Sequence, residues 1–309
     1  MERQFDFLMP SVNFFGPGVI KKIGERAKML NMHKVLVVTE KGLTKIPNGP
    51  VEQTLTSLEQ AGVAYVVFDG VEPNPRSETS RRASSSTWLN IPLVSFNDPM
   101  LMLGIPQAIT AATGMDAFVQ AIEPYVSVDH NPITDSQCVE AIQLIQDALP
   151  KVVANGQNVE ARTKMVEAEM LAGMAFNNAN LGYVHAMAHQ LGGQYDAPHG
   201  MCCALLLTTV EEYNLIACPD RFAELAKVMG YDTTGLTTFE AAHKAIDGMR
   251  EMCKAVGIPA SIKEIGAKPA DFEMMAENAL KDGNAFSNPR KGTKAEVVAL
   301  YQKAYEGIY

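Results

Sequence analysis

The sequence predicts an α/β N-terminal domain over residues 1–97, followed by an all-α domain over residues 98–309. Two observations predict this division. Short apolar runs alternate with amphipathic segments in the first 75 residues, whereas beyond Asn97 apolar residues recur about every 3.6 positions to the end of the chain. The chain has 309 residues, 47% of them hydrophobic and 20% charged, so it is large enough for two globular domains.

Strands are expected at residues 12–16, 34–40, 64–70 and 91–96, with amphipathic helices at 19–31 and 51–62 between the first three. The run KVLVVTE at 34–40 is typical of a strand buried in a parallel sheet. This β-α-β order is how an open nucleotide-binding sheet begins. Residues 76–90, RSETSRRASSSTWLN, have no periodicity and are expected to form a loop or linker. No GxGxxG motif or P-loop is present.

Five long helices are expected in the second domain, because apolar spacing near 3.6 is bounded there by capping residues and by Gly or Asn. They cover residues 110–123, 132–155, 159–178, 239–257 and 293–309.

The run GYVHAMAHQLGGQYDAPHG at 182–200 holds three of the six histidines. His185 and His189 are spaced i,i+4, so on a helix they share one face. Gly192 and Gly193 are expected to end that helix, and the following loop brings back His199. The neighbouring sequence is apolar, so these imidazoles are expected to be buried. Metal ligation is one explanation, and separately hydrogen-bonded core histidines are the alternative.

Asp116 is a carboxylate in an otherwise apolar helix, with Gln120 one turn along the same face. A buried carboxylate needs a cation or hydrogen-bond donors. With His185 and His199, Asp116 would form an O,N,N set suited to Fe²⁺ or Zn²⁺, whereas alone it could be satisfied by hydrogen bonds.

The formal net charge of −9 argues against nucleic acid and against an anionic membrane surface as partners. The N-terminal residues do not resemble a signal peptide, and no apolar run approaches the roughly 20 residues of a membrane span. The five cysteines form no CxxC motif and indicate reduced thiols, so a cytoplasmic location is expected. Cys202 and Cys203 are interpreted as packing residues.

Residues 97–118, 160–200 and 279–292 resemble the iron-dependent (group III) alcohol dehydrogenases, as do FDFLMPSVNFFGPG and FDGVEPNP near the N-terminus. The resemblance covers 1–75 and 88–309. It implies a truncated Rossmann-like domain before an all-helical metal-binding domain, likewise expected to mediate self-association into a homo-oligomer. It also implies NAD-linked interconversion of a primary alcohol, such as 1,3-propanediol, and its aldehyde.

Site residues follow from the same resemblance. Asp116, Gln120, His185 and His199 fall on the metal ligands, and His189 falls on a histidine near the reacting oxygen, suited to relay a proton. In the first domain, Glu40 stands at the adenosine ribose and Asn74 at another adenosine contact. The resemblance also implies two cofactors, a metal ion (Fe²⁺ or Zn²⁺) and NAD.

The chain departs from the family at three places. The glycine turn that binds the pyrophosphate is absent, with RSETSRRASS in its place, so NAD binding is expected to be weak. Gln120 stands for a histidine ligand, and an amide oxygen binds Fe²⁺ or Zn²⁺ more weakly than imidazole. Pro124 is expected to kink or end the helix beside it. Two interpretations stay open: a dehydrogenase with low turnover, and a non-catalytic relative that keeps the helical oligomerisation domain and a weakened metal site. A metal-assisted hydrolase lacks a supporting nucleophile or base.

Overall fold

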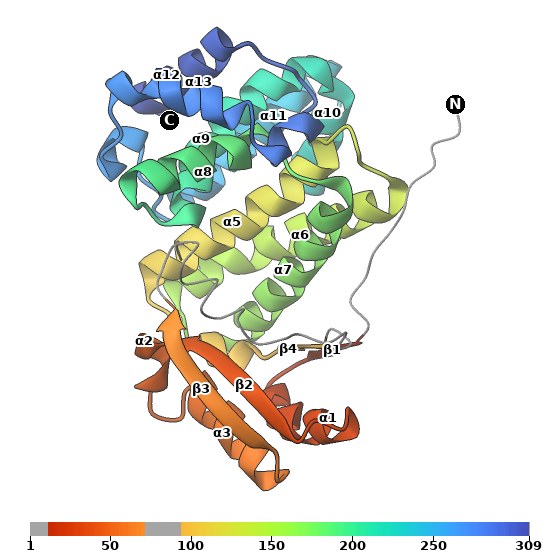
Figure 1. Ribbon diagram of the computed structural model, residues 1–309. Helices are drawn as coiled ribbons and strands as arrows, with labels where there is room; N and C mark the ends of the chain where they lie inside the picture. Colours follow the sequence, from red (N-terminus) through yellow and green to blue (C-terminus); the bar gives the residue numbers. More distant parts are fainter. Residues whose placement is uncertain (1–11, 72–93, 309) are drawn as a thin grey trace. The chain divides into compact units, whose positions relative to one another are not determined.

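The computed structural model describes residues 12–71 and 94–308. Its contacts divide the chain after Gly104 into two compact units, Pro10–Gly104 and a unit that begins at Ile105 and runs to the C-terminus (Figure 1). The first unit holds the described strands and the second is helical. This confirms the fold class expected from the sequence. The expected linker at 76–90 and Asn74 lie outside the described residues.

The N-terminal unit is built from parallel strand pairs. Strand β2 (Lys34–Glu40) pairs with β3 (Ala64–Val71), and β1 (Val12–Phe15) pairs with β4 (Val94–Asn97). Within residues 12–71 and 94–104 these are two separate two-stranded sheets. The expected strands and their parallel pairing are therefore confirmed, although one continuous sheet does not form among them.

The helices and short turns of the N-terminal unit are η1 (Val19–Lys22), α1 (Ile23–Met29), α2 (Lys41–Thr44), α3 (Pro50–Gln60) and η2 (Pro99–Met102). Helices α2 and α3 contact the β2–β3 pair, and α1 and η1 pack on α3. Leu58 of α3 packs with Val63 and Ala27, and Val35 and Val37 of β2 lie against this small core. The expectation that β2 is buried in a parallel sheet is wrong for part of the strand, because Val38 is 41% exposed.

The helical unit begins with three long helices that pack on one another: α5 (Gln107–Val126), α6 (Pro132–Ala154) and α7 (Val159–Ala179) (Figure 1). A capping box starts α6, in which the Asn131 side chain accepts from the Thr134 amide and the Thr134 hydroxyl accepts from the Asn131 amide. Helix α5 continues through Pro124 to Val126, so the expected end of the helix at that proline is wrong. Because the helix closes two residues later, the missing amide disrupts only its last turn.

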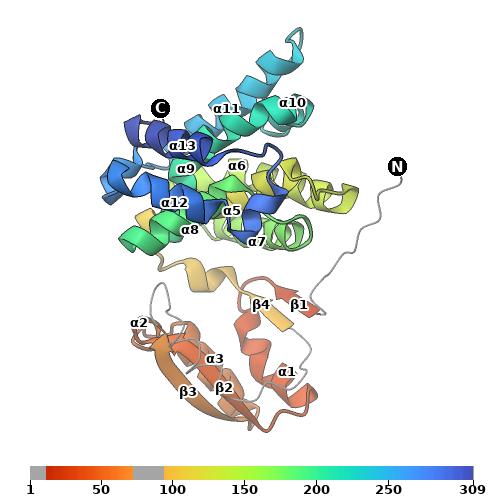
Figure 2. The same ribbon diagram turned by 45° about the horizontal axis from the view of Figure 1, so that its top comes forward.

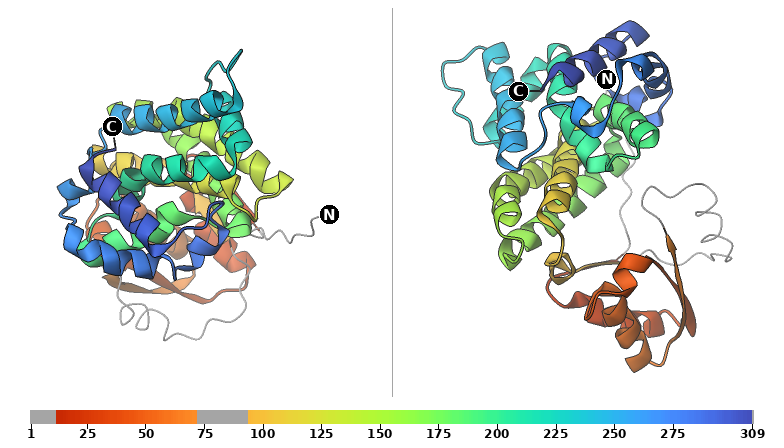
Figure 3. Two further views of the ribbon diagram at one scale, coloured as in Figure 1. Left: turned by 90° about the horizontal axis from the view of Figure 1, so that it is seen from above. Right: turned by 90° about the vertical axis from the view of Figure 1, so that its left-hand side faces the viewer.

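The remaining helices enclose the core of this unit. They are α8 (Tyr183–Tyr195), α9 (His199–Asn214), α10 (Pro219–Val228), α11 (Thr238–Ala255), α12 (Phe272–Ala279) and α13 (Lys294–Glu306), with short turns η3 (Leu215–Ala217), η4 (Ile262–Ile265), η5 (Pro269–Asp271) and η6 (Gly283–Ser287). Helices α12 and α13 pack against α8 and α9 (Figure 2), and α10 and α11 pair with each other (Figure 3). No helix among the described residues is both long and apolar enough to cross a membrane.

The five long helices expected from apolar spacing are confirmed as α5, α6, α7, α11 and α13. The expected stop at Gly192 is wrong, because α8 runs through both glycines to Tyr195. Helix α8 ends instead at Asp196, which adopts a left-handed conformation with φ of 53°.

Candidate metal centre

The imidazole of His185 is oriented by the buried carboxylate of Glu123. The His185 side chain is 2% exposed, and its Nδ1 lies 2.5 Å from Oε2 of Glu123, which is itself 1% exposed. The other oxygen of Glu123 accepts a hydrogen bond from the amide of Val184 at 2.7 Å. When the ring is neutral and Nδ1 carries the proton toward Glu123, the second nitrogen, Nε2, is left with a lone pair. This is the arrangement by which proteins orient a metal-binding imidazole.

Two further candidate ligands lie on the Nε2 side of this ring. Asp116 on α5 places Oδ1 3.5 Å from Nε2 of His185 and 3.6 Å from Nε2 of His199. The turn at Asp196 and Pro198 reverses the chain after α8, so that His199 becomes the first residue of α9. The rings of His185 and His199 lie 5.3 Å apart, centre to centre. Three residues chosen from the sequence are thus brought together from α5, α8 and α9.

Close packing of α9 on α5 makes this convergence possible. A methyl group placed on Gly200 would lie 2.3 Å from the carbonyl oxygen of Ala112 and 3.2 Å from Cβ of Asp116. No side chain fits at such a distance, so the glycine lets the start of α9 approach α5. His199 precedes this glycine and is therefore carried to Asp116.

Cys203 joins the same cluster, one turn after His199 on α9. Its sulfur lies 3.6 Å from Nε2 of His199. The four donor atoms of Asp116, His185, His199 and Cys203 all lie within 4.8 Å of one another. Cys203 was expected to be a packing residue, and its place among these donors was not predicted. The i,i+4 spacing from His199 was the available signal, because such residues share a helix face.

The cluster contains buried donor atoms without hydrogen-bond partners. They are Oδ1 of Asp116, Nε2 of His185 and Oε1 of Gln120. Buried polar atoms are rarely left unpaired, and each unpaired group costs roughly 1–3 kcal/mol. A divalent cation would satisfy the first two, so the residues present fit a metal ion.

The pKa shifts indicate a site that favours positive charge. Burial opposes the charged form of His185, but Cys203, Glu123 and Asp116 outweigh it and raise its pKa well above the usual value. Burial works against ionisation of Asp116 as well, yet the two histidines lower the pKa of this carboxyl. Burial lowers the pKa of His199 and raises that of Cys203 to about 12. The imidazole of His199 is thus neutral and can donate a lone pair, while the carboxylate of Asp116 keeps its charge.

His189 lies beside the cluster without being part of it. Its ring centre is 5.5 Å from that of His199 and 6.2 Å from that of His185. Nδ1 lies 2.7 Å from Oδ2 of Asp282, and the side chain is 40% exposed. The ring is therefore oriented by a carboxylate and is open to solvent.

In the N-terminal unit, Glu40 is the last residue of β2 and directly precedes α2. Ligands of open parallel sheets bind beyond the carboxyl ends of the strands. This position therefore suits contact with a nucleotide.

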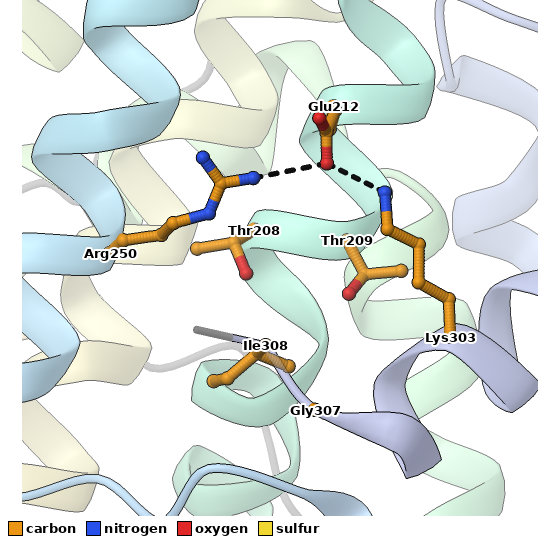
Figure 4. Close-up of a pocket in the computed structure, with 7 residues that line it drawn as sticks. All are labelled: Thr208, Thr209, Glu212, Arg250, Lys303, Gly307 and Ile308. Atoms are coloured by element: carbon orange, nitrogen blue, oxygen red, sulfur yellow. Dashed lines mark hydrogen bonds and ion pairs between the residues drawn. The ribbon is translucent and has the colours of Figure 1, made fainter.

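A pocket of about 390 Å³ lies elsewhere in the helical unit (Figure 4). It is lined by Thr208, Thr209, Glu212, Arg250, Lys303, Gly307 and Ile308. Its cations are already paired, because Glu212 lies 3.1 Å from Arg250 and 2.7 Å from Lys303. None of its lining residues belongs to the histidine cluster.

Comparison with known proteins agrees with the fold. Residues 110–305 match the Fe-containing alcohol dehydrogenase family, C-terminal, and residues 10–87 match Iron-containing alcohol dehydrogenase. The chain belongs to the iron-containing alcohol dehydrogenase family, for which a metal and NAD are implied.

Several relatives are similar over nearly their whole length. The 1,3-propanediol dehydrogenase of Citrobacter freundii is 44% identical, over 98% of this chain and 99% of its own. Alcohol dehydrogenase 4 of Saccharomyces cerevisiae is 33% identical over 97% of this chain and 98% of its own. A solved alcohol dehydrogenase from Oenococcus oeni is 55% identical with a TM-score of 0.92, over 98% of this chain and all of its own.

A solved 1,3-propanediol oxidoreductase has a TM-score of 0.94 at 42% identity, again over 98% of this chain and all of its own. The Citrobacter alignment spans 384 positions, whereas this chain has 309 residues, so at least 75 aligned positions (384 minus 309) have no counterpart here. This bears out the internal deletion expected from the sequence.

Proposed function

We propose that this chain interconverts a small primary alcohol, such as 1,3-propanediol, and its aldehyde at the histidine cluster, with NAD as the redox partner. Asp116, His185 and His199 would hold a divalent metal, and the amide oxygen of Gln120 would add a weaker donor. The single observation that carries the proposal is the convergence of a carboxylate and two imidazoles within about one coordination sphere. The 1,3-propanediol dehydrogenase relatives suggest the substrate.

A divalent metal in such a site supplies Lewis acidity, which polarises an alcohol or carbonyl oxygen. The neighbouring residues account for proton transfer. His189 is fixed through Nδ1 by Asp282, which leaves Nε2 to accept or return a proton. Because 40% of its side chain is exposed, it can exchange that proton with water.

NAD binding is proposed to involve Glu40 and Asn74. The carboxylate of Glu40 would accept hydrogen bonds from the adenosine ribose and would repel a 2′-phosphate, so NAD would be favoured over NADP. Asn74 would contact the adenosine side of the cofactor.

A second candidate is a non-catalytic relative that keeps the metal site but transfers no hydride. The absence of at least 75 family positions favours it, as does the pairing of the described strands in twos. A nucleotide needs backbone amides around its pyrophosphate, and RSETSRRASS stands where the family's glycine turn was expected.

Two measurements test these candidates. Metal analysis of the purified protein should find about one iron or zinc ion per chain, and His185→Ala should lose it. His130→Ala is the matched control, because His130 pairs with Asp135 away from the cluster. NADH is then titrated into the metal-loaded protein, and oxidation of 1,3-propanediol by NAD is assayed. Bound metal with saturable NADH binding and turnover supports the dehydrogenase. Bound metal without either supports the second candidate, and absence of metal refutes both.

The protein is further proposed to act in the cytoplasm as a homo-oligomer. All five cysteines are free thiols, in keeping with a reducing compartment. Two large apolar side chains of the helical unit, Ile216 and Phe286, are 64% and 71% exposed and could be covered in a subunit contact. Light scattering coupled to size-exclusion chromatography measures the oligomeric mass.

A further inference from the structure

Cys203 is placed differently from the other buried cysteines of this chain. Cys253 directs its sulfur at the carbonyl oxygen of Ala204, and Cys202 has no imidazole within hydrogen-bond distance among the described contacts. The sulfur of Cys203 lies 3.6 Å from Nε2 of His199, in the group that also contains Asp116 and His185. A packing role explains the burial of this thiol but not its position among three metal-binding groups.

Three of the six donor pairs have a spacing close to that of a tetrahedron with one sulfur, and all four donor atoms lie within 4.8 Å of one another. Oxygen or nitrogen donors at about 2.0–2.1 Å from zinc lie ~3.3–3.4 Å apart in that geometry, and a nitrogen and a sulfur at ~2.3 Å lie ~3.5–3.6 Å apart. Oδ1 of Asp116 lies 3.5 Å from Nε2 of His185 and 3.6 Å from Nε2 of His199. Nε2 of His199 lies 3.6 Å from Sγ of Cys203. Small adjustments of the side chains would therefore place all the donors around one ion.

Hydrogen bonds do not satisfy every buried polar atom of the cluster, so a bound ion would supply the missing partner. His185 is 2% exposed, and its Nε2 has no hydrogen-bond partner while it points at this group. The side chain of Cys203 is fully buried. Gln120 offers only a neutral amide oxygen, whereas a thiolate brings a negative charge and a soft donor.

We propose that the thiolate of Cys203, in place of the amide oxygen of Gln120, is the fourth protein ligand of the metal, and that it makes this site select Zn²⁺ over Fe²⁺. The inference rests on the proposed function, because it assumes that Asp116, His185 and His199 hold an ion. On binding, the sulfur–metal bond replaces the S–H bond, and the thiol proton leaves to solvent. Soft thiolate in a tetrahedral set with imidazole is the chemistry of zinc sites.

Cobalt substitution tests the assignment directly. The metal-free protein is loaded with Co²⁺, which reports a bound thiolate through an intense sulfur-to-cobalt charge-transfer band in the near ultraviolet. We expect the band in the unchanged protein and in Cys202→Ala, the matched control one residue away on α9. We expect Cys203→Ala to lose the band and to bind Zn²⁺ at least roughly 10- to 100-fold more weakly, the cost of losing even an outer-shell partner. Gln120→Ala should keep the band.

X-ray absorption of the zinc-loaded, unchanged protein gives a second measurement that needs no variant. It should show one sulfur at about 2.3 Å beside nitrogen and oxygen donors. Bound cobalt without the band, or bound zinc without sulfur, would overturn the role of Cys203 and leave the proposed metal site standing. Failure to bind either metal would overturn the proposed site and this inference together.

Discussion

Glu123 orients His185 from the side of the imidazole opposite to the candidate ligands. It accepts from the ring and from the amide of Val184, and it is buried. Gly182 keeps room for it, because a methyl group there would lie 2.8 Å from Oε1 of Glu123. The sequence analysis did not select Glu123, since a glutamate in a helix gives no sign of its partner. A positioning role of this kind becomes visible only when the side chains are placed.

Replacing Glu123 should weaken metal binding without removing a ligand. In Glu123→Gln the neutral amide no longer polarises the imidazole, and zinc affinity should fall roughly 10- to 100-fold. Competition with a chromogenic chelator measures this. Glu160→Gln is the control, because Glu160 is 81% exposed and its ion pair is with Lys164 at the surface. Equal affinities in the two variants would contradict the positioning role.

Glu211 is a fully buried carboxyl with one partnerless oxygen. Burial, helped by the charge of Glu123, raises its pKa to about 8 from the model-peptide value of 4.5. The folded state therefore holds this proton more tightly than the unfolded chain does. Its contribution to stability is complete below about pH 4.5 and is lost as the pH rises toward about 8.

The variant Glu211→Gln keeps the shape and removes this titration. Its urea midpoint should match that of the unchanged protein at about pH 5 and exceed it at about pH 9. The higher midpoint of the variant at about pH 9 arises because the unchanged protein must then bury the charged carboxylate of Glu211 without a cation. A parallel loss of stability with pH in both proteins would refute the assignment of the proton to Glu211.

At the scale of elements, the α8–turn–α9 segment carries three histidines and Cys203. The i,i+4 spacing of His185 and His189 correctly indicated a helix, and the return of His199 was expected. The glycine stop was wrong because glycine within a helix carries only a modest propensity cost, and Tyr195 in the last turn of α8 packs against the core of the helical unit. The position that ends α8 is Asp196, where a short polar side chain accepts the left-handed conformation.

Two glycine substitutions should have opposite effects on this segment. Gly200→Ala would force α9 away from Ala112 of α5, so stability should fall by about 1–3 kcal/mol and metal affinity should fall with it. Gly193→Ala meets no atom within 4 Å and should add about 0.5–1 kcal/mol. Urea denaturation and chelator competition measure both variants. If Gly200→Ala bound zinc normally, the close approach of α9 to α5 would not be what positions His199.

At the scale of the whole molecule, the helical unit has a large continuous core, whereas the N-terminal unit has a small one. The candidate ligands all lie in the helical unit. Because a metal that binds only the folded state stabilises it by mass action, its effect should appear in the unfolding of that unit.

Zinc added to the metal-free protein should raise the midpoint of the main thermal transition. At a free zinc concentration near 100 times the dissociation constant, the free energy of unfolding should rise by about 2.7 kcal/mol. His185→Ala should show no gain, and His130→Ala should show the full one. The same gain in His185→Ala would mean that zinc stabilises the protein from another place.

The sequence by itself determined the fold class, the five long helices, the positions of the four strands and the choice of Asp116, His185 and His199. Those features follow from local periodicity, capping residues and the rarity of clustered histidines. Such signals depend only on residues that are close in the sequence. Tertiary structure decided the rest. The partnership of Glu123 with His185, the place of Cys203 among the donors and the length of α8 depend on contacts between α5, α8 and α9. A donor distance is a property of packed helices, and no pattern along one helix contains it.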